Sequence, residues 1–258
     1  MQRETILETT TGAVTVLTMN RPTRRNAFNS QQYCELRDAL GDALADDRVR
    51  AVVITGSPGA FSAGQDMSEM IPTGDSGDGH GFATFMDRLC SFDKPLLAAV
   101  NGVGVGLGLT MCLHCDVVYI AESARLRCPF VSLGVVPEAG SSLLLPLVAG
   151  YQRAAEVLLT AEWIDAERAV ALGIAARRLP DAELLPATLA KAAEIARHPL
   201  GALRHTKRLL LATRADALRD ARAREDAAFA ERIGSPENLE AVRAFLEKRA
   251  PDFGAKPS

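Results

Sequence analysis

Two glycine-bearing turns carry the residues best placed to act on a ligand through the main chain. Residues 60–66 read A-F-S-A-G-Q-D, and residues 101–108 read N-G-V-G-V-G-L-G. Glycine has no Cβ and adopts positive φ readily, so a ligand can approach the backbone closely at such turns. Each turn is expected to lead into a helix, whose first N–H groups favour negative charge. The pattern therefore indicates main-chain donors for an anion or a polarised oxygen.

Three other glycine motifs do not fit. A dinucleotide-binding loop needs G-x-G-x-x-G, but the sixth position is Leu107 counted from Gly102 and Leu109 counted from Gly104. No P-loop lysine follows either turn. The A-F-S-A-G segment is similar to a serine nucleophile elbow, but Ala60 stands where the first glycine belongs. Close packing of a helix on a strand remains a second explanation for the 101–108 cluster.

Cysteine and histidine chemistry is not favoured. Cys112 and Cys115 form a C-x-x-C around His114, but no second pair occurs and the segment is expected to be a buried helix. Free cysteines in apolar packing are therefore predicted there, rather than a metal or redox site. The other three histidines stand far apart in the sequence. Five cysteines are an odd count, which argues against a disulfide framework.

Short apolar strands must position the two turns. The first half of the chain alternates such strands with a helical pattern of apolar residues at 33, 36, 40 and 44. The predicted strands span residues 13–19, 51–55, 96–100 and 116–120. The strands at 51–55 and 96–100 each run into one of the turns, so an α/β fold with repeated strand and helix units is expected.

The second half has a different character. From about Gln152 the pattern predicts almost continuous helix rich in alanine, leucine and arginine. It is expected to be broken at four prolines, which are Pro180, Pro186, Pro199 and Pro236. The segment 71–81, with four glycines, lacks periodicity and is predicted to be a loop beside the first turn. It is either a lid over a ligand or an insertion without function.

Composition limits the partners. With 258 residues and 48% hydrophobic content, the chain can bury a large core. The net charge of −3 argues against a nucleic-acid surface. We expect no membrane contact, because no apolar run reaches the length of a spanning helix, and the polar N-terminus suggests no secretory leader. A cytoplasmic protein is expected.

The chain resembles the crotonase superfamily, also called the enoyl-CoA hydratase/isomerase family. The resemblance covers nearly the whole chain and rests on several fragments in the same order and spacing. These are N-R-P at 20–22 with N-A-F at 26–28, the two turns, C-D at 115–116, L-G at 133–134 with Pro137, and F-L-E-K-R-A-P at 245–251. It implies a spiral core of strand-strand-helix units over residues 1–195 and a C-terminal helical region over 196–258 that packs trimers, often paired into hexamers.

The resemblance gives the turns a role. In the family, two peptide N–H groups hold the thioester oxygen of an acyl-CoA, and the matching residues here are Gln65 and Leu107. Negative charge builds on that oxygen when an enolate forms, and a single preorganised donor typically lowers the barrier by about 3–4 kcal/mol. CoA thioester is then the substrate, and no cofactor or metal is implied.

The acid or base beside this oxyanion hole decides the reaction. The two glutamates of the family's hydratases fall at Thr110 and Phe130 here, and neither can take a proton at neutral pH. A carboxylate occurs instead at Glu138, in a segment similar to peroxisomal-type 3-enoyl to 2-enoyl-CoA isomerases, where the equivalent glutamate is the sole base. Without the resemblance, Glu138 would rather be interpreted as an acid that complements the start of a helix.

The resemblance also implies a binding site for the rest of the ligand. Arg24 and Arg25 match positions that meet CoA phosphates, with Arg25 the better match, and the lysine equivalent to Lys248 reaches the 3′-phosphate bound by a neighbouring subunit. A solvated surface charge remains an alternative for each. The backbone near Ala63 is expected to meet adenine, and further ligand contacts are expected at Ala27, Asp66, Gly106 and Phe130.

Together these observations predict an enzyme that converts a 3-enoyl-CoA into a trans-2-enoyl-CoA, in fatty acid degradation. Two alternatives remain. One is an enoyl-CoA hydratase or another lyase of the same fold. The other is an acyl-CoA-binding module that has no catalytic activity.

Overall fold

A six-stranded sheet forms the centre of the computed structural model, which describes residues 3–69 and 81–254. The strand order is β1 (Ile6–Thr11), β2 (Val14–Met19), β3 (Ala51–Gly56), β5 (Leu96–Val100), β7 (Val117–Ala121) and β10 (Arg177–Leu179). β1 is antiparallel to β2, and the other neighbours are parallel. Every residue of β3 and β5 is buried, which is typical of the middle of a covered parallel sheet. The four predicted strands are confirmed.

A smaller, four-stranded sheet contains parts of both glycine turns. Its order is β4 (Ala60–Ser62), β6 (Val103–Val105), β8 (Arg125–Arg127) and β9 (Ile164–Asp165). The turns therefore differ from the simple strand, turn and helix predicted for them. The first leads into a 3-10 helix, η2 (Met67–Glu69), and the second into the single-turn helix α3 (Leu107–Thr110), which continues as the 3-10 helix η3 (Met111–His114).

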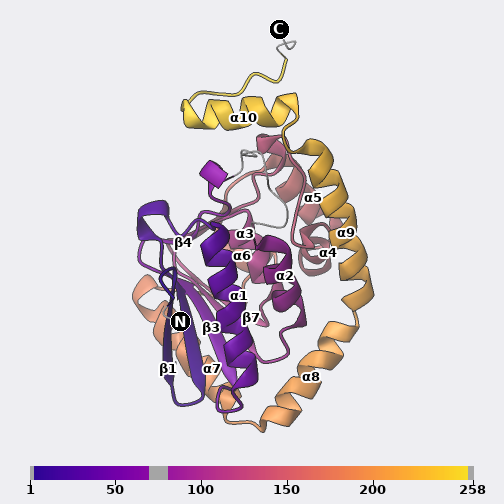
Figure 1. Cartoon of the computed structure of the whole chain (residues 1–258). Helices are drawn as coiled ribbons and strands as arrows, with labels where there is room; N and C mark the ends of the chain where they lie inside the picture. Colours follow the sequence, from indigo (N-terminus) through magenta and orange to yellow (C-terminus); the bar gives the residue numbers. More distant parts are fainter. Residues whose placement is uncertain (1–2, 70–80, 255–258) are drawn as a thin grey trace.

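Helices cover the sheets. α1 (Ser30–Ala45) begins where the side chain of Asn29 accepts a hydrogen bond from the Gln32 N–H, and α7 (Asp181–Ala196) packs against β2, β3, β5 and β7. Figure 1 shows α8 and α9 along one side of the molecule, and α10 across one end. The remaining helices are η1 (Pro22–Arg24), α2 (Phe82–Ser91), η4 (Val131–Leu133), α4 (Ser141–Ala149), α5 (Tyr151–Thr160), α6 (Ala166–Ala171), α8 (Leu200–Ala212), α9 (Ala215–Arg232) and α10 (Pro236–Leu246).

The second half is mainly helical, as predicted, with two corrections. β9 and β10 lie in this half and extend one sheet each, although two or three residues are too few to show an alternating pattern. Pro186 does not break the chain but lies inside α7, whereas Pro180 and Pro199 stand at helix N-caps and Pro236 opens α10. A proline is best tolerated in the first turn of a helix, so of these four only Pro186 is unusual, and it shares this feature with Pro146 inside α4.

The architecture is a mixed α/β fold with a largely parallel sheet covered by helices, as the resemblance implies. α7 ends at Ala196, next to the predicted boundary between the spiral core and the C-terminal region, and the division into 1–195 and 196–258 stays a prediction. Within the described ranges, no helix is long and apolar enough to cross a membrane. Of the predicted loop at 71–81, residues 71–80 lie outside the described residues.

Candidate active site

The two glycine turns lie directly against each other. β4 pairs with β6 in parallel, so that Ser62 stands beside Gly104. Gly64 has φ of +83°, and a Cβ at this position would lie 2.6 Å from the Val105 carbonyl oxygen. A Cβ at Gly108 would lie 2.4 Å from the Ser62 carbonyl oxygen. Both distances are far too short for a real contact, so glycine is required at both positions to bring the turns together.

This contact places the main-chain groups of Gln65 and Leu107 on neighbouring turns. Phe28 donates its N–H to the Gly64 carbonyl at 2.7 Å and accepts from the Asp66 N–H at 2.8 Å. In such a parallel bridge the N–H of the middle residue, Gln65, points away from Phe28. Leu107 is the first residue of α3, where an N–H has no partner within the helix. Among the described residues, neither N–H donates to an acceptor.

Gly106 leaves room beside these donors. Its φ is +52°, and nothing lies within 4 Å of the point where a Cβ would stand. Its own N–H is already donated to the Arg127 carbonyl at 2.9 Å. Gly106 is therefore held in place by the neighbouring strand while its other side stays open for a ligand to approach the backbone.

The Gln65 side chain is fixed by Tyr33. The Tyr33 hydroxyl donates to Oε1 of Gln65 at 2.7 Å, and the Tyr33 ring stacks on Phe28 with centroids 4.8 Å apart. Burial raises the pKa of Tyr33 well above its usual value, and the negative charges of Glu138 and Glu69 raise it further. Tyr33 is therefore a neutral donor at physiological pH, and it connects Gln65 with the surroundings of Glu138.

Glu138 is a partly buried carboxylic acid. It keeps some accessible surface, yet protein atoms surround it densely. This desolvation, assisted by the charges of Glu225 and Asp226, raises its pKa from 4.5 to about 7. Among the described residues, no group donates a hydrogen bond to the carboxylate or forms an ion pair with it. Such a group can take up and release a proton near neutral pH.

The alternative role for Glu138, as an acid at a helix start, is filled by another residue. α4 begins at Ser141, three positions after Glu138, and its N-cap is Gly140. The Gly140 and Ser142 N–H groups donate to the two carboxylate oxygens of Glu225 at 2.6 and 2.8 Å. Glu225 comes from α9, so the Glu138 side chain is not needed to cap α4.

The turn after Glu138 has an uncommon backbone. Ala139 has φ of +60° and Gly140 has φ of +73°. Nε2 of His114 lies 2.7 Å from the Ala139 carbonyl oxygen, so this nitrogen must carry the proton and donate. Burial lowers the pKa of His114 to about 4, which keeps the ring neutral. A left-handed alanine costs on the order of 1–3 kcal/mol and persists only where its surroundings enforce it.

Thr110 and Phe130 occupy the two positions where hydratases of the family that this chain resembles have glutamates. Both side chains are buried, at 0% and 4% exposure. Thr110 Oγ1 has no hydrogen-bond partner among the described residues. Neither residue offers a second carboxylate beside Glu138.

The residues predicted to bind the rest of the ligand lie near the first turn. Arg24 and Arg25 are exposed on and after η1, and the Arg25 carbonyl accepts from the Ala63 N–H at 2.9 Å. The Ala27 N–H donates to the Arg24 carbonyl at 3.0 Å. The Asp66 carboxylate is buried and accepts from Arg21 at 3.0 Å and from Ser68, so its side chain already has protein partners.

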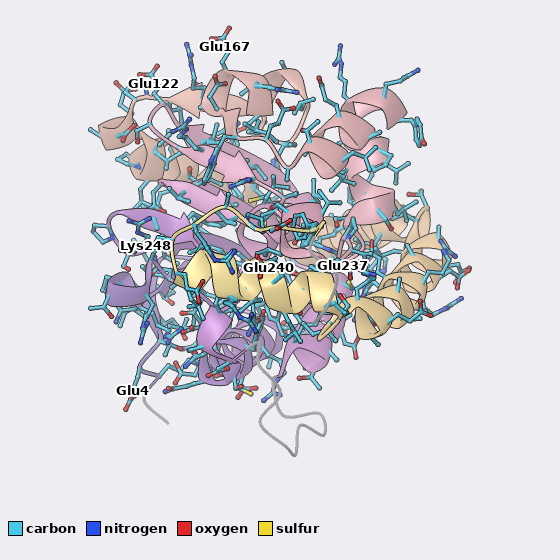
Figure 2. The ribbon with its side chains drawn as sticks, turned by 90° about the horizontal axis from the view of Figure 1, so that it is seen from above. Glu4, Glu122, Glu167, Glu237, Glu240 and Lys248 are labelled. Atoms are coloured by element: carbon cyan, nitrogen blue, oxygen red, sulfur yellow. The ribbon has the colours of Figure 1, made fainter. Side chains whose placement is uncertain are left out.

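Lys248 comes from the C-terminal part of the chain. It is exposed and follows α10, with φ of +56°. Figure 2 shows α10 crossing the upper face, with Glu237 and Glu240 along the helix and Lys248 near its C-terminal end. The position suits a contact with a ligand of another subunit, which stays a prediction.

The cysteines are free thiols. Cys112 lies in the helical segment α3 to η3, as predicted, whereas Cys115 is the extended residue directly after η3. Burial raises the pKa of both thiols. In the part of the chain that the structure describes, no cluster of metal-ligating side chains occurs.

The comparisons with known proteins agree with this geometry. The sequence profile of the enoyl-CoA hydratase/isomerase family matches residues 9–256. The chain belongs to the enoyl-CoA hydratase/isomerase family. It is 36% identical over 247 residues to the 2,3-dehydroadipyl-CoA hydratase of Escherichia coli K12, covering 93% of this chain and 94% of the relative. It is 34% identical over 261 residues to the 1,2-epoxyphenylacetyl-CoA isomerase of the same organism, covering 98% and 99%.

Solved structures of this family are equally similar. An enoyl-CoA hydratase/isomerase from Pseudoalteromonas atlantica superposes with a TM-score of 0.93 at 37% identity, covering 97% of this chain and 100% of the other. OdaA of Pseudomonas aeruginosa superposes with a TM-score of 0.90 at 37% identity, covering 94% and 99%. The chain is therefore a family enzyme that processes acyl-CoA, and its relatives include both hydratases and isomerases.

Sequence reasoning missed three residues of this enoyl-CoA hydratase/isomerase site. Tyr33 was expected only as part of a helix pattern, and His114 only as a residue inside the C-x-x-C. Glu225 lies 85 positions from Gly140, on a helix without any distinguishing motif. Only the folded chain shows that these side chains surround Glu138 and Gln65.

Proposed function

We propose that this enzyme isomerises 3-enoyl-CoA to trans-2-enoyl-CoA in fatty acid degradation, with Glu138 as the single base. The observation that carries the proposal is a partly buried carboxyl group with a pKa of about 7 and no polar partner among the described residues. One base suffices for a double-bond shift, because the group that removes a proton from C2 can return it to C4. Thr110 and Phe130 support this choice, since a second carboxylate to activate water is missing from those positions.

In the proposed reaction, the Gln65 and Leu107 N–H groups hold the thioester oxygen. Glu138 takes a proton from C2, and the electron pair of the C2–H bond delocalises onto this oxygen to form a dienolate. The protonated Glu138 then delivers the proton to C4, which restores the carbonyl and leaves the double bond between C2 and C3. No cofactor takes part, because the CoA thioester is the substrate and the two donors supply the charge stabilisation.

For the nucleotide, we propose that Arg24 and Arg25 contact CoA phosphates, with Ala27, Ala63, Asp66, Gly106 and Phe130 lining the rest of the path. Lys248 would reach the 3′-phosphate in a neighbouring subunit of a trimer or hexamer. Large apolar side chains are exposed on the C-terminal helices, including Leu209, Leu210, Phe245 and Leu246, and suit burial between subunits. Light scattering coupled to size-exclusion chromatography measures the assembly, and a monomer would contradict it.

Hydration is the second candidate, because a relative of this chain is named a hydratase. The test offers the purified protein a 3-enoyl-CoA and, separately, crotonyl-CoA, a 2-enoyl-CoA. Formation of the conjugated product from the first, with slow hydration of the second, supports the isomerase. Rapid hydration of crotonyl-CoA would favour the hydratase or another lyase. Tight binding of both without turnover would leave an acyl-CoA-binding module.

A further inference from the structure

We propose that Glu225, from α9 in the C-terminal helical region, is a positioning residue for Glu138. Its carboxylate holds the backbone turn that follows the base, so that the C-terminal region takes part in building the active site. The inference rests on the proposed role of Glu138 and adds a residue 87 positions further along the chain.

The contacts of Glu225 converge on this turn. Oε2 accepts from the Gly140 N–H at 2.6 Å and Oε1 accepts from the Ser142 N–H at 2.8 Å. Glu225 is 5% exposed, so both hydrogen bonds are shielded from water. Hydrogen bonds to an ionised carboxylate are stronger than neutral ones, and two acceptors from one group fix position as well as distance.

α9 packs against the turn without a gap. A Cβ at Gly140 would lie 2.2 Å from Cδ1 of Leu218, so the Leu218 side chain of α9 lies directly against this glycine. Arg222, one helical turn before Glu225, pairs with Asp87 of α2 at 2.9 Å and ties α9 to the spiral core. The helix therefore has a defined place from which Glu225 can reach the turn.

His114 holds the same turn from the other side. Its Nε2 donates to the Ala139 carbonyl at 2.7 Å, while Glu225 accepts from the next N–H along the chain. The two residues thus bind both polar groups of the peptide that joins Ala139 to Gly140. This peptide lies one residue after Glu138, and Ala139 has a left-handed backbone conformation. The orientation of the peptide therefore sets the direction of the Glu138 side chain.

The charged and titratable groups facing Glu138 come from several elements. Besides burial, the charges of Glu225 and Asp226 of α9 raise the pKa of Glu138. Burial and, to a smaller extent, the charge of Glu138 raise the pKa of Tyr33 of α1 and of the Cys128 thiol before η4. His114 of η3 is neutral, because its pKa is about 4. Among these groups, Glu225 alone combines a negative charge with hydrogen bonds to the turn.

Glu225→Gln tests the proposal by removing both properties. The Gly140 and Ser142 N–H groups bind different carboxylate oxygens, and in glutamine one of these positions is an NH2 group, which cannot accept. We expect kcat at the high-pH plateau to fall by about 10- to 100-fold, because a small misplacement of a reacting group has this effect. KM for the acyl-CoA should change little. The rise of kcat/KM with pH should move to lower pH, because a like charge next to Glu138 is lost.

Three further variants separate position from charge and from folding. Asp226→Asn removes a like charge but no hydrogen bond to the turn, so it should shift the pH dependence with a smaller loss of plateau kcat than Glu225→Gln. Glu225→Asp keeps the charge and should restore part of kcat with a nearly unchanged pH dependence. Asp220→Asn, an exposed acid on the same helix, should match the wild type.

The outcomes also distinguish this inference from the proposed function. Carbon-13 NMR of the Glu138 carboxyl, assigned by its loss in Glu138→Gln, measures the titration without any turnover. A lower titration midpoint in Glu225→Gln shows that Glu225 faces Glu138 even if no enoyl-CoA is isomerised, which would overturn the function alone. Folded Glu225 variants with wild-type kcat would overturn the inference, whether or not the midpoint shifts. Failure of both Glu225 variants to fold would assign the residue to stability alone and overturn it as well.

Discussion

The Tyr33 hydroxyl donates a 2.7 Å hydrogen bond to Oε1 of Gln65, the residue whose main-chain N–H is proposed to hold the thioester oxygen. The charge of Glu138 also raises the pKa of this same phenol. The Tyr33 hydroxyl thus orients the Gln65 side chain, and its pKa responds to the charge of Glu138.

Replacement of Tyr33 tests this connection. In Tyr33→Phe the ring contacts with Phe28 and Phe85 can persist, but the Gln65 side chain loses its donor. A net hydrogen bond contributes about 1 kcal/mol, so we expect kcat to fall by roughly fivefold with little change in KM. Steady-state kinetics check this, and an unchanged kcat would show that the Gln65 side chain does not need to be oriented.

The contact between the two turns gives a second prediction. Gly64→Ala adds a methyl group 2.6 Å from the Val105 carbonyl oxygen, so the two turns must move apart. We expect kcat to fall by about 100-fold, since displaced donors no longer meet the developing charge. Gly12→Ala is the matched control, because Gly12 also has positive φ, +59°, but nothing within 4 Å. Equal kinetics in both variants would contradict the prediction.

The ionisation of Glu138 predicts a pH dependence of activity. A base must be deprotonated to act, so kcat/KM should rise with pH and level off above about 7. His114 has a pKa of about 4 and should add no second ionisation between pH 5 and 8. A profile that falls from pH 5 to pH 8 would contradict the assignment of Glu138 as the base.

The same ionisation predicts how stability depends on pH. The pKa of Glu138 is about 7 in the folded protein, against 4.5 for a glutamate in an unfolded chain. Between pH 4.5 and 7, the protein therefore takes up a proton when it folds. The cost of ionising this group is absent below 4.5, grows between the two values and is complete above 7, where it reaches about 3 kcal/mol. Glu138→Gln lacks this cost. Urea unfolding should therefore show the variant gaining stability over wild type from pH 5 to pH 8, and a constant difference would argue against the raised pKa.

His114 provides a test of the backbone turn. His114→Leu leaves the Ala139 carbonyl without its donor, which costs about 1–3 kcal/mol for a buried group. We expect lower thermal stability and a lower kcat, with the midpoint of the pH profile unchanged, because the neutral ring contributes no charge. His114→Gln can place an amide donor nearby and should recover part of both losses. Wild-type stability in the leucine variant would show that the turn holds without His114.

The sequence predicted the fold and the two turns because their signals are local. Buried strands such as β3 and β5 are continuous apolar runs, and the glycines of 60–66 and 101–108 stand where the backbone needs them. The short strands β4 and β6 within the turns could not be predicted, because three residues are too few to show periodicity. Pro186 inside α7 shows the opposite case, in which tertiary packing overrides a local helix breaker.

For the site, the resemblance supplied Glu138 as a candidate, but residues alone could not separate a base from a helix-capping acid. The folded chain separates them, because Glu225 caps α4 and the Glu138 carboxylate has no hydrogen-bonding or ion-pair partner among the described residues. Contacts between positions as distant as 140 and 225 leave no pattern in a single sequence. Tyr33, His114 and Glu225 could therefore be recognised only from coordinates.

The most direct test of the central claim is the isomerisation rate of a 3-enoyl-CoA with wild type and Glu138→Gln, followed by the absorbance of the conjugated product. The substitution keeps the shape of the side chain but removes its ability to carry the proton. We predict a fall in kcat of about a thousandfold, with an unchanged dissociation constant for a saturated acyl-CoA. Isomerisation at the wild-type rate by Glu138→Gln would contradict the account.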